Sequence, residues 1–511
     1  MTTLASSPTR LKISARKSDL ARLQAQQVGS ALQQNNPNLE IEYSFRESLG
    51  DKNLVDPLWK IPEKGVFTED FMQDLLEGKT DLVVHSWKDL PTEKKTQTMI
   101  AATLPRADAR DLLLMKKSSQ GRSQLRIYSS SPRREANIGP ILPELLPWKV
   151  EGIEFESVRG NIQTRVKKLL ESSNLDGLIL AKAALDRLLS AEGEEFRQTR
   201  DFLRKSLLDL AWMVLPLTAN PNAAAQGALA VEIRSDREDL QTLLQSINCE
   251  KTFTAAQRER ELLQAFGGGC HLALGMSVVK DADWTLTLVK GKTPAGERVE
   301  RREIQMNSTA TRELGEFSSD ELWSLKPEGM TRKTKAHQVK LEAQKGYVVS
   351  RIEAWPVNFS PESAAGFDLK IWTSGLKTWK KLAKKGIWVL GTFDGLGDHH
   401  PPATGALLGD VEWVTLTHQR HPKLEDSERP RLATYETEAP ELMIKNQKFF
   451  FWRSSSQFLQ ALRESPWIRE RFHAAGPGST LRTLKAHIPE DKLFVFLSEE
   501  DWRKTLEHKF N

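Results

Sequence analysis

The chain has 511 residues, which is more than one hydrophobic core organises, so we expect several domains. Its composition, 39% hydrophobic and 28% charged, is that of an ordinary globular protein, and a net charge of +5 gives no general case for binding nucleic acid. Two cysteines fit a reducing compartment, and we find neither a signal-peptide core nor a run of ~18 apolar residues, so we expect a cytoplasmic protein without a membrane partner.

The first 190 residues alternate short apolar strands with amphipathic helices. Strands are predicted over residues 10–14, 39–45, 81–86, 124–131, 153–160 and 176–181. Helices are predicted over residues 18–37, 66–79, 132–142, 161–173 and 183–190. This alternation implies mainly parallel sheets with helices on both faces. Polar residues collect just after the strands, where open α/β sheets bind their ligands.

The pattern changes near residue 250. A helix over 252–266 is followed by a glycine turn and three strand-like segments up to residue 306, which predicts a small α+β unit. Residues 307–327 look like a connector with some helical character. Beyond residue 328 a faint duplication pairs 367–382 with 448–462, and 387–397 with 472–484. Each of these segments is predicted as a strand, a turn and a helix, so we expect a two-lobed α/β domain.

One cysteine, Cys270, follows three glycines in the stretch QAFGGGCHLALG. No Cys/His cluster at ligand spacing surrounds it, so we predict no metal site, and the other cysteine is Cys249. Cys270 is then either a small buried residue or a reactive nucleophile. The glycines favour the nucleophile, because they remove side chains from the approach to the sulfur.

Basic and hydroxyl side chains gather where predicted strands meet helices. The candidates from this pattern are Arg16, Ser18, Lys60, Lys64, His85, Ser86, Lys88, Ser129, Ser131, Arg133, Arg134, Arg159, Arg165 and Arg187. Helix N-termini and arginine forks both bind carboxylates and phosphates, so the predicted ligand is a polyanion larger than one phosphate ester. No glycine-rich nucleotide fingerprint is present, because GGGC is followed by strand-like sequence.

Asp89 lies beside Lys88 in this basic setting. It is either a capping or salt-bridged aspartate, or a carboxylate that stabilises a transient cation while the arginines hold the anionic parts of a ligand. We interpret His85 as structural.

Seven motifs follow one another along this part of the chain: SARKSDLA, KGVF, HSWKDLPTE, SSSPRRE, VRGNIQTR, AAQGALAVEIR and ERELLQAFGGGCHLALG. In these motifs the chain resembles the hydroxymethylbilane synthase family, also called porphobilinogen deaminase, over residues 10–305. The resemblance implies that Cys270 carries a dipyrromethane cofactor through a thioether. It also implies that four porphobilinogen units are joined head to tail with release of ammonia, and that the linear tetrapyrrole is then freed by hydrolysis. Every pyrrole bears an acetate and a propionate, so the growing chain is a polyanion.

The same resemblance assigns roles to residues. It implies that Asp89 is the catalytic aspartate, which contacts pyrrole nitrogens and stabilises an azafulvene cation. It implies that Lys60 and Lys64 lie on an active-site loop whose aromatic cover is Phe67. The carboxylate-binding residues that it implies are Arg16, Ser18, Lys88, Arg133, Arg134, Arg159, Arg165 and Arg187, with hydroxyl help from Ser129 and Ser131.

Two positions depart from the family pattern. Pro132 precedes the arginine pair where an apolar residue is usual, which affects the expected helix start. Ala225 replaces the first glycine of the family's GQGA segment, which affects the expected backbone near the domain hinge.

Further motifs lie beyond residue 328: MTRKTKAHQVKLEAQKGYVVSRIEAWPV, DLKIWTSGLKTWKKL, LATYETEAP and FFFWRSSSQFLQAL with HAAGPGSTLRTL. They resemble uroporphyrinogen-III synthase over residues 328–511. That family closes the linear tetrapyrrole into a ring while inverting its last pyrrole, and a tethered second enzyme raises the rate at which an unstable intermediate is captured. The cleft residues that we predict are Thr373, Ser374, Ser455, Gly476, Ser479 and Thr480, with Tyr435 as an acid.

The resemblances together imply a fold class and a domain order. We expect two periplasmic-binding-protein-like α/β domains, a small α+β domain with the cofactor cysteine, and a two-lobed α/β domain. The expected ranges are 10–109 with 206–250, then 110–205, 251–306, a connector over 307–327, and 328–511. We expect a monomeric bifunctional enzyme with porphobilinogen and the linear tetrapyrrole as its small-molecule partners. The alternatives are a deaminase with an inactive C-terminal binding module, and an anion-binding protein without catalysis.

Overall fold

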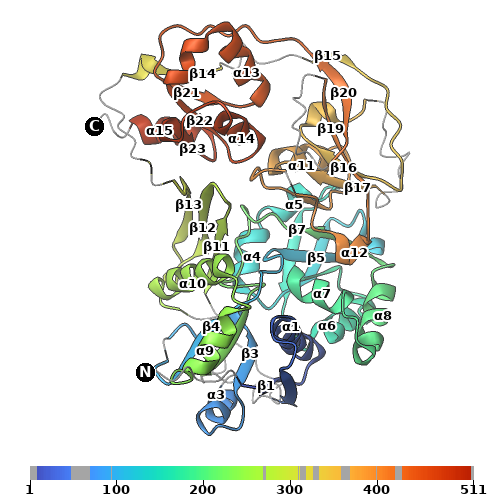
Figure 1. Ribbon diagram of the computed structural model, residues 1–511. Coiled ribbons are helices and arrows are strands. Elements are labelled where there is room, and N and C mark those ends of the chain that lie inside the picture. Colours follow the sequence, from blue (N-terminus) through green and yellow to red (C-terminus); the bar gives the residue numbers. More distant parts are fainter. Residues whose placement is uncertain are drawn as a thin grey trace, which may run out of the picture. The chain divides into compact units, whose positions relative to one another are not determined.

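The computed structural model describes residues 8–47, 69–93, 95–268, 272–308, 310, 318–325, 333–357, 369–398, 400–419 and 429–507 (Figure 1). The chain divides into two compact units. The first unit comprises Met1–Pro143, Lys149–Val278 and Leu288–Arg301, and the second comprises Glu144–Trp148, Val279–Thr287 and Arg302–Asn511. Both units are mixed α/β.

The first unit contains a five-stranded sheet that begins with the N-terminal strand. Its spatial order is β2 (Glu40–Arg46), β1 (Arg10–Arg16), β3 (Leu82–Ser86), β10 (Leu229–Arg234) and β4 (Thr98–Ala102). Strand β1 is parallel to β2 and β3, and β10 is antiparallel to β3 and β4. The helices of this part are α1 (Asp19–Asn35), α3 (Glu69–Leu76) and α9 (Glu238–Gln245).

Helix α1 covers this sheet with the apolar face that its periodicity predicts. Ala25, Val28 and Leu32 are fully buried against Leu11 and Ile13 of β1. The helix begins after Ser18, whose hydroxyl accepts a hydrogen bond from the Ala21 N–H and so satisfies one donor of the first turn.

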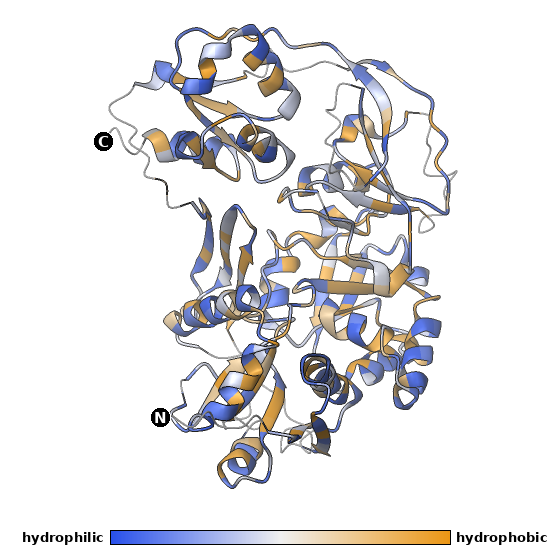
Figure 2. Cartoon of the chain, in the orientation of Figure 1, coloured by the Kyte–Doolittle hydropathy of each residue, from blue (hydrophilic) through white to orange (hydrophobic). Residues whose placement is uncertain are grey.

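A second five-stranded sheet has the same arrangement. Its spatial order is β7 (Gly152–Glu156), β6 (Gln124–Tyr128), β8 (Gly177–Ala181), β5 (Asp111–Lys116) and β9 (Leu210–Val214). Strand β6 is parallel to β7 and β8, while β5 is antiparallel to β8 and β9. Every residue of β8 is buried, as its uninterrupted apolar sequence requires (Figure 2). The helices of this part are α4 (Pro132–Ile138), α5 (Leu142–Leu145), α6 (Ile162–Glu171), α7 (Lys182–Leu189) and α8 (Arg197–Ser206).

The chain passes between these two sheets twice, through residues 103–110 and 215–228. The two crossover segments touch, because the Ala107 N–H donates to the Gly227 carbonyl at 3.2 Å. Strand β9 pairs with β5, so residues 210–214 lie in the second sheet and not with the range 206–250 that we expected in the first. Local periodicity identifies such a strand but carries no information on its partner.

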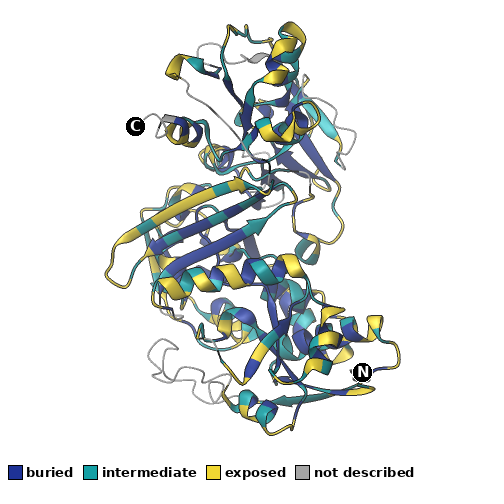
Figure 3. Cartoon of the chain, turned by 60° about the vertical axis from the view of Figure 1, so that its left-hand side comes forward, coloured by how far each residue is buried: buried dark blue, intermediate teal, exposed yellow. Residues whose placement is uncertain are grey.

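Helix α10 (Glu250–Ala265) follows and leads toward a three-stranded sheet. The strands are β11 (Ala273–Lys280), β12 (Trp284–Lys292) and β13 (Arg298–Met306), in that order. The outer strand β13 is mostly exposed (Figure 3). Gly291 allows close approach of the strands, because a Cβ there would lie 1.8 Å from the Ala273 carbonyl oxygen.

The second unit contains two further sheets. The larger one has the order β15 (Lys333–Ala336), β20 (Arg431–Thr437), β19 (Trp413–His418), β16 (Gly346–Val349), β17 (Lys370–Thr373) and β18 (Gly391–Thr392). The smaller one has the order β14 (Leu322–Ser324), β21 (Phe449–Trp452), β22 (Phe472–Ala475) and β23 (Leu493–Val495). All strand pairs are parallel except β15 with β20. The helices are α11 (Leu376–Ala383), α12 (Gly405–Leu408), α13 (Ser455–Glu464), α14 (Ser479–Lys485) and α15 (Glu499–Glu507).

Two details differ from the sequence-based expectation. Residues 322–324, inside the expected connector, form β14 and pair with β21, because Leu322 and Trp323 are apolar and become buried. Residues 387–397 were expected to form a strand, a turn and a helix, but β18 has only two residues and no helix follows before residue 398. Gly395 and Gly397 there have φ values of +74° and +106°, which end regular structure.

Candidate active site

Asp89 stands at the carboxyl end of β3, on a short 3-10 helix, Trp87–Asp89. Trp87 is buried and contacts the Phe253 ring at 5.2 Å between centroids, which anchors this turn on helix α10. The Asp89 side chain is exposed and Lys88 is half-buried. Lys88 Nζ donates to Gln226 Oε1 at 3.3 Å, which ties the site to the second crossover segment.

Arg133 and Arg134 follow β6, in the first turn of α4. Pro132 occupies the first position of this helix, which proline tolerates because its missing N–H would have no partner in the helix. Both arginines are buried, and both donate to the Asp111 carboxylate at 2.8 Å. Arg133 also donates to the Asn220 side chain at 2.9 Å. A buried carboxylate shared by two guanidinium groups holds both in fixed orientations.

Arg159 and Arg165 follow β7, near the start of α6. Arg165 Nε donates to the Gly160 carbonyl at 2.8 Å. Burial lowers the pKa of Arg165 to about 10; the charges of Arg134 and Arg159 lower it further, while Asp89 opposes them. Arg165 therefore stays protonated at neutral pH, and it lies within electrostatic reach of both Arg134 and Asp89.

The carboxyl ends of the two sheets thus bring one group of charges together. Burial lowers the pKa of Lys88; Asp89 and Asp111 raise it, and Arg134 and Arg133 lower it. We call Lys88, Asp89, Arg133, Arg134, Arg159 and Arg165 the basic cluster. With Asp111 it contains five cations and two carboxylates, so positive charge is in excess.

The remaining predicted residues of the first unit lie on neighbouring elements. Ser18 caps α1, and the Ser86 hydroxyl exchanges hydrogen bonds with the Gln24 amide at 3.0 and 3.2 Å. Arg16 ends β1, and Ser129 and Ser131 precede α4. Arg187 donates to the Gly227 carbonyl at 2.9 Å, and burial lowers its pKa to about 10. Cys270, Lys60, Lys64 and Phe67 lie outside the described residues.

Sequence reasoning missed the polar residues that hold the basic cluster. Gln226 is buried, and its amide donates to the Ala109 carbonyl at 2.7 Å and to Asp111 at 3.0 Å. Glu259 is fully buried on α10 and accepts two hydrogen bonds from Arg106, at 2.8 and 2.7 Å. A glutamate amid polar neighbours on a helix looks like a surface residue, so its pattern contains no signal for this role.

His85 lies in β3 with its side chain toward β10. Its Nε2 is 3.0 Å from a carboxylate oxygen of Glu232, and Lys95 and Thr98 donate to the other oxygen at 3.0 and 2.6 Å. Glu232 is buried, and hydrogen bonding and charge from His85 and Lys95 outweigh burial and lower its pKa to about 2. This arrangement fits the structural interpretation of His85.

The predicted residues of the second unit lie at the carboxyl ends of both its sheets. Thr373 ends β17 and Ser374 follows it; Ser455 begins α13; Gly476 follows β22. Ser479 and Thr480 begin α14. Tyr435 lies in β20, where burial raises the pKa of its hydroxyl.

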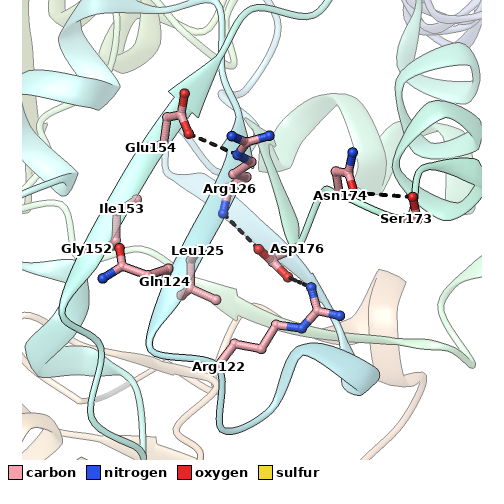
Figure 4. Close-up of a pocket in the computed structure, with 10 residues that line it drawn as sticks. All are labelled: Arg122, Gln124, Leu125, Arg126, Gly152, Ile153, Glu154, Ser173, Asn174 and Asp176. Atoms are coloured by element: carbon pink, nitrogen blue, oxygen red, sulfur yellow. Dashed lines mark hydrogen bonds and ion pairs between the residues drawn. The ribbon is translucent and has the colours of Figure 1, made fainter.

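A surface hollow lies at the amino ends of β6 and β7, away from all these residues (Figure 4). Its Asp176 carboxylate accepts hydrogen bonds from Ser119 at 2.7 Å, from Arg122 at 3.0 Å and from the Arg126 N–H at 2.8 Å. Arg126 in turn pairs with Glu154 at 2.9 Å. These charges balance one another, so the hollow has structural ion pairs and no surplus charge for a ligand.

Two searches were limited to the part of the chain that the structure describes. Within it, no group of three or more His, Cys, Asp or Glu side chains is placed to hold a metal ion. Within the same residues, no helix has the length and apolar character needed to cross a membrane.

Comparison with known proteins points to one family for the first part of the chain. Residues 11–242 match the family described as "Porphobilinogen deaminase, dipyromethane cofactor binding domain". The porphobilinogen deaminase of Syntrophomonas wolfei is 38% identical over 264 residues, which are 51% of this chain and 78% of that protein. That of Chromobacterium violaceum is 36% identical over 283 residues, 55% of this chain and 82% of that protein.

Solved structures with similar parts include two binding domains. The methionine binding protein MetQ covers 50% of this chain and 96% of its own, with 9% identity and a TM-score of 0.25. The reduced OxyR regulatory domain of a Pseudomonas covers 47% of this chain and 96% of its own, with 11% identity and a TM-score of 0.24.

Proposed function

Because the chain belongs to the porphobilinogen deaminase family, we propose that its basic cluster is the site where porphobilinogen units are joined into a linear tetrapyrrole. Each addition breaks the C–N bond of one aminomethyl group, forms a C–C bond to the next pyrrole and releases ammonia. The observation that carries this proposal is the exposed Asp89 carboxylate amid Lys88, Arg134 and Arg165.

The family domain binds a dipyrromethane cofactor, and the basic cluster fits such a group. Its five cations exceed its two carboxylates, so further carboxylates of a bound oligopyrrole would offset a real excess of charge. When bound, the dipyrromethane supplies the pyrrole to which substrate units are added. We assign its binding to Arg133 and Arg134, which Asp111 orients, and its thioether to Cys270.

The chain's own residues then act on the substrate. Lys88, Arg159 and Arg165 bind the acetate and propionate groups of incoming porphobilinogen. Asp89 accepts a hydrogen bond from the pyrrole N–H and stabilises the positive charge that develops as ammonia leaves. The supporting residues in this proposal are Arg16, Ser18, Lys60, Lys64, Phe67, Ser86, Ser129, Ser131 and Arg187.

Replacing Asp89 tests the proposed site. Asp89→Asn keeps the shape of the side chain and removes its charge, so porphobilinogen turnover should fall by about 100-fold or more. Asp201→Asn, on the exposed face of α8, is the matched control and should keep full turnover. Turnover by Asp89→Asn within threefold of the unmodified chain would exclude Asp89 from catalysis.

A specific feature of the second unit favours a second function, cyclisation of the tetrapyrrole to uroporphyrinogen III. Its two mainly parallel sheets carry hydroxyl residues at their carboxyl ends, where α/β sheets bind ligands. The loops at these ends touch, because a Cβ on Gly478 would lie 3.2 Å from Gly397 Cα. In this proposal Thr373, Ser374, Ser455, Gly476, Ser479 and Thr480 line the ligand site, and Tyr435 is the acid.

The isomer of the ring product tests the second function. The full chain supplied with porphobilinogen should yield mainly the type III ring, because the second unit captures the tetrapyrrole before it closes spontaneously. Mainly type I ring would identify the second unit as a binding module without cyclase activity.

The domain order and the location of the enzyme are part of this proposal. The deaminase part comprises 10–109 with 206–250, then 110–205 and 251–306, with β9 counted in the second sheet; the cyclase part comprises 328–511 with β14 added to its smaller sheet. We place the enzyme in the cytoplasm, as a monomer.

A further inference from the structure

Two arginines of the second unit face each other from different sheets. Arg431 is the first residue of β20 in the larger sheet, and Arg482 lies in the second turn of α14, which packs on the smaller sheet. Both side chains are half-buried. Burial lowers the pKa of Arg431, the carboxylate of Asp398 opposes this, and the charge of Arg482 lowers it again. The two guanidinium groups are therefore close enough to repel each other.

The backbone brings these arginines together. Gly478, which precedes α14, has a φ of +144° and lies against Gly397, with only 3.2 Å between an added Cβ and Gly397 Cα. Asp398 is the next residue of that loop. A side chain on Gly478 would separate the loop from α14, so glycine there permits the close approach of the two like charges.

The acidic group nearest to this pair is already in use. Asp398 Oδ2 is 3.5 Å from Arg429 Nη2, and Arg429 also donates to the carbonyls of Asp398 and His400. The Arg429 guanidinium stacks on the Phe393 ring at 5.1 Å. Arg482, by contrast, has no hydrogen-bond or ion-pair partner among the residues that the structure describes. Three cations thus share one carboxylate.

We propose that Arg431 and Arg482 form a carboxylate-binding pair, which holds a polycarboxylate between the two sheets of the second unit. Two converging guanidinium groups bind carboxylates through forked hydrogen bonds, and an anion between them removes their mutual repulsion. This inference rests on the proposed cyclase function, because the linear tetrapyrrole is such a polycarboxylate. It adds two side chains that hold the substrate by charge to the hydroxyl residues of that site.

Binding of uroporphyrin III, a stable octacarboxylate, to the full chain tests the pair. Equilibrium dialysis should show that Arg431→Gln and Arg482→Gln each weaken binding at least tenfold. Arg463→Gln, an exposed arginine on α13, is the matched control and should bind like the unmodified chain. Arg482→Lys keeps the charge without the fork and should recover part of the affinity. Sites in the first unit are the same in all four variants.

Two results would overturn the inference: no saturable binding by the unmodified chain, or equal affinity of the unmodified chain and both glutamine variants. The ring isomer, measured alongside, separates this from the proposed function. If the unmodified chain makes only the type I ring while binding still depends on both arginines, the cyclase function fails and the pair stands. If all variants make type III ring with unchanged affinity, the pair fails and the cyclase function stands.

Discussion

Gln226 is the residue whose single side chain joins the two sheets of the first unit. Its amide oxygen accepts from Lys88, and its nitrogen donates to Asp111, the carboxylate that orients Arg133 and Arg134. The position of Lys88 beside Asp89 and that of the arginine pair therefore depend on the same amide. We infer that Gln226 is a positioning residue for the deaminase reaction.

Gln226→Leu should raise the KM for porphobilinogen about tenfold, because Lys88 loses its acceptor and Asp111 loses a donor. Lost buried hydrogen bonds should also lower the free energy of unfolding by about 1–3 kcal/mol. Gln257→Leu, on the exposed face of α10, controls for the change of residue type. A variant with lowered stability and an unchanged KM would reduce Gln226 to a structural residue.

Glu232 makes the stability of the first unit depend on pH. Its pKa in the folded chain is about 2, against a model value of 4.5, so the folded state binds its proton later than the unfolded state. This contribution is complete above pH 4.5 and is lost as the pH falls toward 2; at about 1.4 kcal/mol for each pH unit it amounts to about 3 kcal/mol.

Glu232→Gln should therefore flatten the acid limb of the stability curve. Chemical denaturation at pH 6 and pH 3 measures the effect: the unmodified chain should lose more free energy of unfolding over this interval than the variant. Equal losses in both proteins would show that other carboxylates dominate the acid limb.

The charged residues at the strand ends could be predicted from the sequence, and their supporting partners could not. Lys88, Asp89 and the Arg133–Arg134 pair each follow a recognisable strand. Asp111, however, meets Gln226 and Asn220 across 115 and 109 residues of chain, and no local pattern encodes such a contact.

At the scale of elements, the second crossover segment has an unusual backbone. Ala225 has a φ of +63°, a conformation that glycine adopts freely and alanine does not, and its N–H donates to Glu259 at 2.7 Å. The departure from the family's glycine is thus accommodated by a buried hydrogen bond. Gly227 follows with a φ of +87° and a place for no side chain, since a Cβ would lie 2.5 Å from the Ala107 carbonyl oxygen.

Gly227→Ala should destabilise the chain more than an alanine at another glycine with the same φ. Gly296 has a φ of +85° and no neighbour within 4 Å of an added Cβ, so Gly296→Ala measures conformational strain alone, about 1 kcal/mol. Gly227→Ala adds the clash with the first crossover segment and should lower the free energy of unfolding by about 2 kcal/mol more. Equal losses in the two variants would mean that the crossover segments separate without cost.

Element types followed from periodicity more reliably than element partners did. Helix α1 begins after Ser18, as its cap predicts, and α14 follows β22 with the expected glycine turn. The expected helix near residue 397 is absent from the described residues, because glycines with positive φ occupy its start. Capping residues act within one turn, whereas the choice of strand neighbours depends on distant residues.

At the scale of the whole molecule, the family match and the resemblance of the C-terminal part have different standing. Residues 11–242 carry the family match, and the relatives reported above cover 51% and 55% of this chain. The second unit has its own sheets and its own core, with Phe449, Phe451 and Trp502 buried together. A bifunctional chain is therefore proposed from two independent sites, each with its own assay.

The intact mass of the purified chain tests the central claim most directly, because a covalent oligopyrrole leaves a mass that no binding protein without it would show. We predict that the protein is heavier than its sequence by one dipyrromethane and that Cys270→Ser loses this difference. The Cys249→Ser control should retain it. A mass equal to that of the sequence, or an added mass that persists in Cys270→Ser, would contradict the account.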